Sequence, residues 1–160
     1  KFSVAFGLSY TMIILLPLAT VCAYIMDTFV LVPLDAQYLR LLVFISVILL
    51  LGLCLKQWGN KVSDKLGELF NIFMPLAAIN TAVLGTLLLN QQYTQSLWQS
   101  FIFGLGSGLG FALILLMLTA INERLQAADV PVPFRGMSIT LITLGLISMA
   151  FLGFAGLSDI

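Results

Sequence analysis

Long apolar runs, separated by short polar or charged groups, dominate the chain. No charged residue occurs at positions 2–26 or at positions 41–55. A helix needs about 20 apolar residues to cross a bilayer core of about 30 Å. The first run therefore predicts a membrane helix. The second run is too short to cross by itself, but Arg40 and Lys56 at its ends can extend their charged groups to water. Residues 38–58 therefore predict a second membrane helix.

A third charge-free stretch, at positions 69–122, is too long for a single span. The polar run NQQYTQ at 90–95 divides it into two predicted helices. The five predicted spans are residues 2–26, 38–58, 69–89, 97–121 and 137–157. This pattern predicts an all-α polytopic membrane helix bundle, with residues 1–160 forming one integral membrane domain.

Composition excludes several other classes of protein. Hydrophobic residues make up 61% of the chain and charged residues only 9%, with a mean hydropathy of +1.11. Soluble domains carry roughly a quarter charged residues. Seven basic and seven acidic residues leave no net charge, so no electrostatic signature of nucleic-acid binding is present. The chain has no histidine, which excludes histidine-dependent catalysis and histidine metal ligands.

Basic residues predict the orientation in the membrane. Five crossings place Arg40 on one side and the other basic residues on the opposite side, which the positive-inside rule makes cytoplasmic. These other residues are Lys1, Lys56, Lys61, Lys65, Arg124 and Arg135. We therefore expect a multi-pass membrane protein with its C-terminus facing outward.

The third predicted span carries residues that are unusual at mid-membrane. Pro75 removes a backbone donor, and Asn80, Thr81 and Gly85 follow it. A broken helix around a site at the bilayer midplane has this pattern. A plain hydrogen bond from Asn80 or Thr81 to a neighbouring helix would explain the same residues equally well.

Four glycines alternate along the fourth predicted span. Gly104 with Gly108, and Gly106 with Gly110, form overlapping small-xxx-small pairs, which let helix backbones approach closely. The segment IFGLG at 102–106 also matches AFGLS at 5–9 in the first span. The two helices run in opposite directions in the predicted topology, so the match indicates an inverted-topology repeat. Chance similarity between two leucine-rich helices is an equal alternative.

A proline-containing loop joins the last two spans. Its prolines favour extended backbone, and an aromatic side chain stands beside an arginine. We interpret it as a fixed cytoplasmic docking loop, although packing on its own bundle is equally compatible with the pattern. Its candidate residues are Asp129, Pro131, Pro133, Phe134, Arg135 and Gly136.

Several motifs together resemble a known family. They are TVCAYIMD at 20–27, VPL at 32–34, YLR at 38–40, IFMPL at 72–76, NTAVLG at 80–85, ERL at 123–125, ADVP at 128–131, PFRG at 133–136 and FLGFAGL at 151–157. Over nearly the whole chain they resemble the A-type membrane component of the Rnf ion-translocating electron-transport complex (RnfA). The NqrD and NqrE subunits of the sodium-pumping quinone reductase are similar but less close.

The resemblance implies a fold and a function. Such subunits have six membrane helices in two inverted halves, so the family's first helix is expected to be missing before Lys1. They pair with a homologous E-type subunit within a larger complex in the lipid bilayer, which the resemblance places in the bacterial inner membrane. The resemblance implies a translocase that moves electrons between ferredoxin and NAD and couples this to sodium or proton transport. It implies no catalytic residue in this chain by itself.

The resemblance also implies an iron–sulfur cluster shared with the homologous subunit. The family provides one cluster cysteine in an Asn-Cys-Ala motif, which here reads Asn80-Thr81-Ala82. Thr81 therefore occupies the metal-ligand position, and a hydroxyl is a poor substitute for a thiolate. Two other functions remain open at this point: a small-solute or ion transporter without a redox role, and a structural scaffold subunit.

Overall fold

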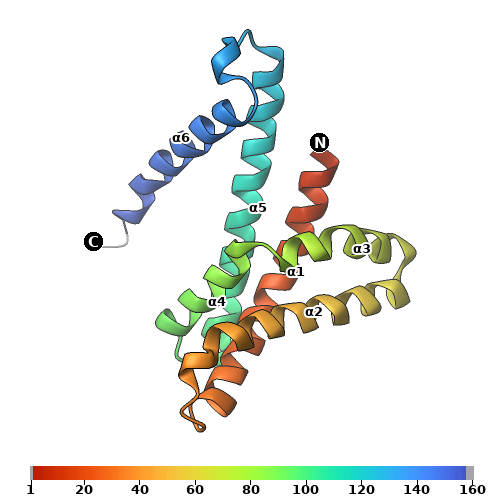
Figure 1. Ribbon diagram of the computed structural model, residues 1–160, viewed down its shortest axis with the longest axis vertical. Helices are drawn as coiled ribbons and strands as arrows, with labels where there is room; N and C mark the ends of the chain where they lie inside the picture. The colour runs from red at the N-terminus through yellow and green to blue at the C-terminus, as the bar shows by residue number, and fades with distance from the viewer. Residues whose placement is uncertain (1, 158–160) are drawn as a thin grey trace.

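The computed structural model describes residues 2–157, apart from the side chain of Leu66. In this part of the chain all regular structure is helical (Figure 1). The α-helices are α1 (Phe2–Met26), α2 (Arg40–Val62), α3 (Asp64–Ala78), α4 (Thr81–Tyr93), α5 (Leu97–Ala127) and α6 (Met137–Ala155). A π-helical turn, Asp27–Leu31, extends α1, and short 3-10 turns precede α2 and α6. The predicted all-α class is confirmed.

Four helices are long and apolar enough to cross a membrane. They are α1 with its π turn, α2 with its preceding turn, α5 and α6. A fifth crossing is possible through α3 and α4, which meet at an angle of 66° after a short break. The chain is therefore a polytopic membrane bundle with four or five candidate spans, and the predicted helix break lies between α3 and α4, which form a broken span or a re-entrant loop.

The axis of the bundle is the packing of α1 against α5, which lie side by side (Figure 1). At Gly104 an added Cβ would lie 2.7 Å from the Pro17 Cα and 2.9 Å from the Leu16 carbonyl oxygen. At Gly108 it would lie 3.2 Å from the Ile13 Cα. These two glycines therefore allow two backbones to touch, as expected for small residues between membrane helices.

The other two glycines of the run lie elsewhere on α5. An added Cβ at Gly106 or Gly110 would meet no atom within 4 Å in the described part of the chain. Among the described residues, only the Gly104 and Gly108 pair makes the predicted close helix contact.

Apolar side chains of α1 form the centre of the core. Met12, Leu15 and Leu16 are buried against Phe44 of α2 and Phe70 of α3, among others. Because lipid is itself apolar, close van der Waals packing holds these helices together, more than burial from water does. Helix α6 is the exception: only 11% of its span is buried, and it splays away from α5 (Figure 1).

Candidate functional site

The break between α3 and α4 is built around Asn80. Its backbone is extended, with φ −72° and ψ 120°, and its side-chain oxygen accepts a hydrogen bond from the Ala82 amide at 3.0 Å. This N-cap satisfies a backbone donor that the first turn of a helix would otherwise leave free. Asn80 thus starts a new helix in the middle of an apolar segment.

Pro75 has a smaller part in the break than the sequence indicated. It lies inside α3, and the helix continues past it to Ala78. The Ile79 amide still donates a hydrogen bond to the Pro75 carbonyl at 3.2 Å, so the bend lies beyond Ile79. The cap at Asn80 therefore fixes the position of the bend. Gly85 lies one turn into α4, and a Cβ added there would meet no described atom within 4 Å.

The break is exposed on this chain. Ile79 is 80% exposed, Thr81 is also exposed, and Asn80 is half-buried. Interrupted backbone at membrane depth is tolerated only where protein covers it or where it lines a water-filled cavity. The exposed break therefore requires either cover by protein outside the described part of this chain or contact with water.

Residues at the break do not fit a thiolate-ligated iron–sulfur cluster. Thr81 offers a hydroxyl where a cysteine sulfur would be required. The residues described, 2–157, contain no group of three histidine, cysteine or acidic side chains able to hold a metal ion. Cys22 lies in α1 and Cys54 in α2, both as free thiols. We derive no electron-transfer step through such a cluster.

A buried polar cluster, formed by Thr20, Asn90, Thr94 and Ser100, was not foreseen from the sequence. The Asn90 amide nitrogen donates to the Ser100 hydroxyl at 3.2 Å and to the Thr20 carbonyl at 3.4 Å. The Thr20 hydroxyl donates to the Ser100 carbonyl at 2.9 Å, and the Thr94 hydroxyl contacts Asn90 and Ser100. The cluster ties α4 and the start of α5 to α1.

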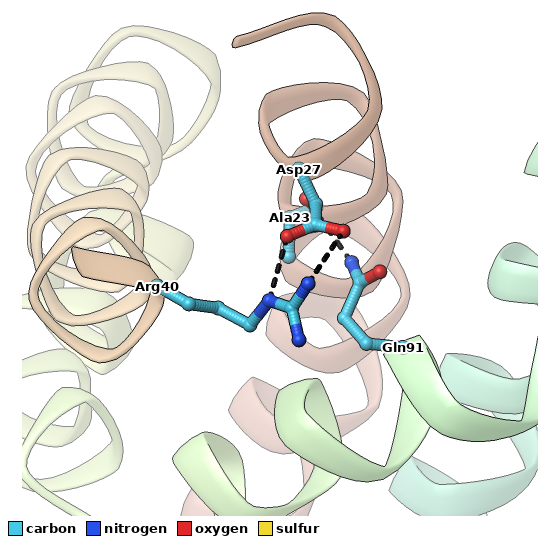
Figure 2. Close-up of polar contacts among 4 residues, drawn as sticks. All are labelled: Ala23, Asp27, Arg40 and Gln91. Atoms are coloured by element: carbon cyan, nitrogen blue, oxygen red, sulfur yellow. Dashed lines mark hydrogen bonds and ion pairs between the residues drawn. The ribbon is translucent and has the colours of Figure 1, made fainter. Parts of the chain in front are cut away.

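A second unforeseen feature is an ion pair between Asp27 and Arg40, shown in Figure 2. The Arg40 Nε donates to one carboxylate oxygen of Asp27 at 2.7 Å, and an Nη donates to the other at 3.3 Å. Gln91 of α4 lies beside the pair and donates to the Ala23 carbonyl at 3.3 Å. Because Asp27 directly follows the first apolar run, its charge gave no sequence signal of this site.

The predicted docking loop is ordered by its own contacts. Arg135 donates from Nε to the Val130 carbonyl at 2.7 Å and lies 3.7 Å from the Asp129 carboxylate. Gly136 has φ +80°, a conformation that other residues rarely adopt, and starts α6. Pro131, Pro133 and Phe134 are exposed, with Val132–Phe134 in a 3-10 turn.

A cavity of about 720 Å³ opens beside this loop, between α1, α5 and α6. Its apolar walls include Val4, Leu8 and Leu115, whereas Glu123 and Arg135 contribute charge. None of the described residues that line it is aromatic, so they offer no ring for stacking a flavin or nicotinamide.

Together these features define a polytopic membrane protein with one capped, broken span. The family model for the Rnf-Nqr subunit, membrane protein, matches residues 1–158. The chain belongs to this family, as the motifs in its sequence predicted.

Relatives that match nearly the whole chain are named as the A-type component of an ion-translocating oxidoreductase complex. The one from Pasteurella multocida is 48% identical over 157 residues, covering 98% of this chain and 82% of the relative. The one from Actinobacillus pleuropneumoniae serotype 5b is 46% identical over 160 residues, covering 100% and 83%. The one from Pseudoalteromonas translucida is 46% identical over 157 residues, covering 98% and 81%.

Proposed function

We propose that this chain is a membrane subunit of an ion-translocating oxidoreductase complex that couples electron transfer, of the ferredoxin–NAD type, to sodium or proton transport. The observation that carries the proposal is the 48% identity, over 98% of the chain, to the A-type component from Pasteurella multocida. The chain contributes membrane structure and an ion path, while redox groups on other subunits carry out electron transfer.

The exposed break supports a neighbour of the homologous, E-type class of membrane subunit. A second subunit of the same fold would present its own broken span, so two interrupted backbones could cover each other at the midplane. The Gly106 and Gly110 face of α5 leaves room for another helix to approach closely. The exposed loop around Phe134 is a suitable docking surface for water-soluble subunits of the complex.

The break also has the chemistry of an ion path. The C-terminal end of α3 presents carbonyl oxygens, and the N-terminal end of α4 presents amides, within one apolar segment. Asn80 and Thr81 add neutral oxygens at the same depth. We propose that the Thr81 hydroxyl helps to orient a transported cation where the family has a cluster ligand.

Purification with a tag on this chain, in mild detergent, tests membership of the complex. We expect flavin-bearing subunits, ferredoxin-type subunits and a homologous membrane subunit to copurify, whereas isolation of a lone homodimer would contradict the proposal. Thr81→Cys supplies a thiolate and should raise bound iron above wild type where a neighbouring subunit supplies the remaining cluster ligands, and should leave iron unchanged where other ligands have taken over. Thr81→Val, which keeps the shape without the hydroxyl, should leave iron unchanged and lower ion pumping. If neither variant changes iron or pumping, Thr81 is an ordinary packing residue.

Orientation is tested separately by cysteine labelling from outside intact cells. We expect a cysteine at Lys61 or Gln126 to resist an impermeant reagent, because the basic residues place both positions in the cytoplasm. A cysteine at Asp35, in the turn between α1 and α2, should react and serves as the positive control. Efficient labelling at Lys61 would reverse the topology.

A further inference from the structure

Asp27 is the only charged residue that is buried among the residues described. Its side chain is 9% exposed, whereas that of Arg40 is 32% exposed. It lies in the π-helical turn that ends the first span, on the side that the basic residues predict to be outward. A π turn within a helix occurs frequently at functional sites, and an ionisable group in a span is a candidate for an ion path.

The dipoles of α1 and α2 act on both charges of this pair. Asp27 is an anion at the C-terminal, negative end of α1, and Arg40 is a cation at the N-terminal, positive end of α2. The backbone of each residue is at the helix end that disfavours its charge, but the Arg40 guanidinium lies against the Asp27 carboxylate at the end of α1, where the dipole favours a cation. The position beside Asp27 is therefore a cation position.

We propose that the Asp27 carboxylate is a sodium-binding site on the outward side of the ion path, with Arg40 as a built-in counter-ion that sodium displaces. The inference rests on the proposed role in ion transport and adds a location to it. A sodium ion beside Asp27 gains the same attraction from the carboxylate and from the α1 terminus.

Neutral oxygens around the carboxylate favour sodium over a bare proton. The Ala23 carbonyl lies beside Asp27 (Figure 2). The Gln91 side chain donates a hydrogen bond to this carbonyl and also carries an amide oxygen. Carbonyl oxygens at the ends of interrupted helices are the ligands that transporters use for sodium. A proton would need only the carboxylate.

The exchange keeps the buried carboxylate paired at every stage. An unpaired charge in an apolar interior is costly, so Asp27 needs a cation at all times. The guanidinium is part-exposed on a long side chain, so it can move to water when sodium enters and return when sodium leaves.

Helix α4 connects this site to the break. Thr81 begins α4 and Gln91 lies ten positions later, about 15 Å along a helix at 1.5 Å per residue. An ion that passes the midplane at the break can therefore reach Asp27 along one continuous helix.

The test uses the whole complex in proteoliposomes, with sodium uptake and sodium-dependent electron transfer measured together. Asp27→Asn should abolish sodium uptake while the subunits still copurify, because Arg40 can turn to water. Arg40→Gln should lower the half-saturating sodium concentration about tenfold, because sodium no longer competes with the Arg40 guanidinium for Asp27. A tenfold change corresponds to about 1.4 kcal/mol of sodium-binding free energy. The maximal rate should fall as well, because no counter-ion helps sodium to leave.

Asp35→Asn is the matched control, because Asp35 is exposed in the connection between α1 and α2 and its positive φ suits asparagine. It should behave as wild type. Equal loss of assembly in Asp27→Asn and Arg40→Gln, with unchanged half-saturation in the residual activity, would show a structural clasp and overturn the inference. Wild-type transport of protons without sodium would overturn it too. A wild-type complex that moves no ion would instead contradict the proposed function itself.

Discussion

Gly104→Leu is expected to separate α1 from α5 and to prevent stable assembly. The new side chain would start 2.7 Å from the Pro17 Cα and 2.9 Å from the Leu16 carbonyl oxygen, which are backbone atoms. Because no rotamer can relieve a clash with backbone, the two helices must move apart. Overpacking costs about 1–3 kcal/mol where side chains can yield, so we expect about 3 kcal/mol or more here.

Gly106→Leu is the matched control on the same helix. An added side chain there meets no described atom within 4 Å, so the folded chain should tolerate it within about 0.5 kcal/mol. The measurement is the thermal midpoint of each variant, purified in detergent as the chain alone, because the Gly106 face is also the proposed contact with a neighbouring subunit. Equal melting of the two variants would show that α1 and α5 are not packed through Gly104.

The glycine run shows what sequence spacing can and cannot determine. The spacing predicted close helix contact through both small-xxx-small pairs. Residues two positions apart on a helix are rotated by about 200° around its axis. The Gly104–Gly108 pair and the Gly106–Gly110 pair therefore face nearly opposite directions. A single neighbouring helix can contact only one pair, and the position of α1 decides that it is Gly104 with Gly108.

The broken span was predictable for a related reason. Proline and asparagine within an apolar segment are both costly, so their presence indicated an interruption. Its position depended on which residue could satisfy the free amides of the next helix. The Asn80 side chain does so, and the bend therefore lies after Ile79, beyond Pro75.

Two polar features were hidden because their partners are distant in sequence. Asp27 coincided with the predicted end of a span, where a charge needs no explanation. Its pairing with Arg40 depends on the turn that brings α2 back beside α1. The run at 90–95 had the composition of a connector, yet Asn90 lies inside α4, which continues to Tyr93.

Asn90→Leu is expected to loosen α4 and the start of α5 from α1. Asn90 is fully buried, and its side chain contacts the Thr20 carbonyl and the Ser100 and Thr94 hydroxyls. Leucine has a similar size, so the change removes hydrogen bonds without opening a large cavity. Hydrogen bonds between membrane helices contribute on average about 0.6 kcal/mol and at most about 1.7 kcal/mol each. Losing those of Asn90 should cost about 2 kcal/mol in total.

Gln92→Leu, an exposed amide on the same helix, provides the comparison and should change stability by less than about 0.5 kcal/mol. Thermal midpoints of the two purified variants in one detergent measure the difference. Because α4 carries both Thr81 and Gln91, a loosened α4 should also weaken sodium-dependent electron transfer in Asn90→Leu. An Asn90→Leu variant that melts and transports as Gln92→Leu does would show that the buried polar cluster neither holds α4 in place nor aligns the two ends of the proposed ion path.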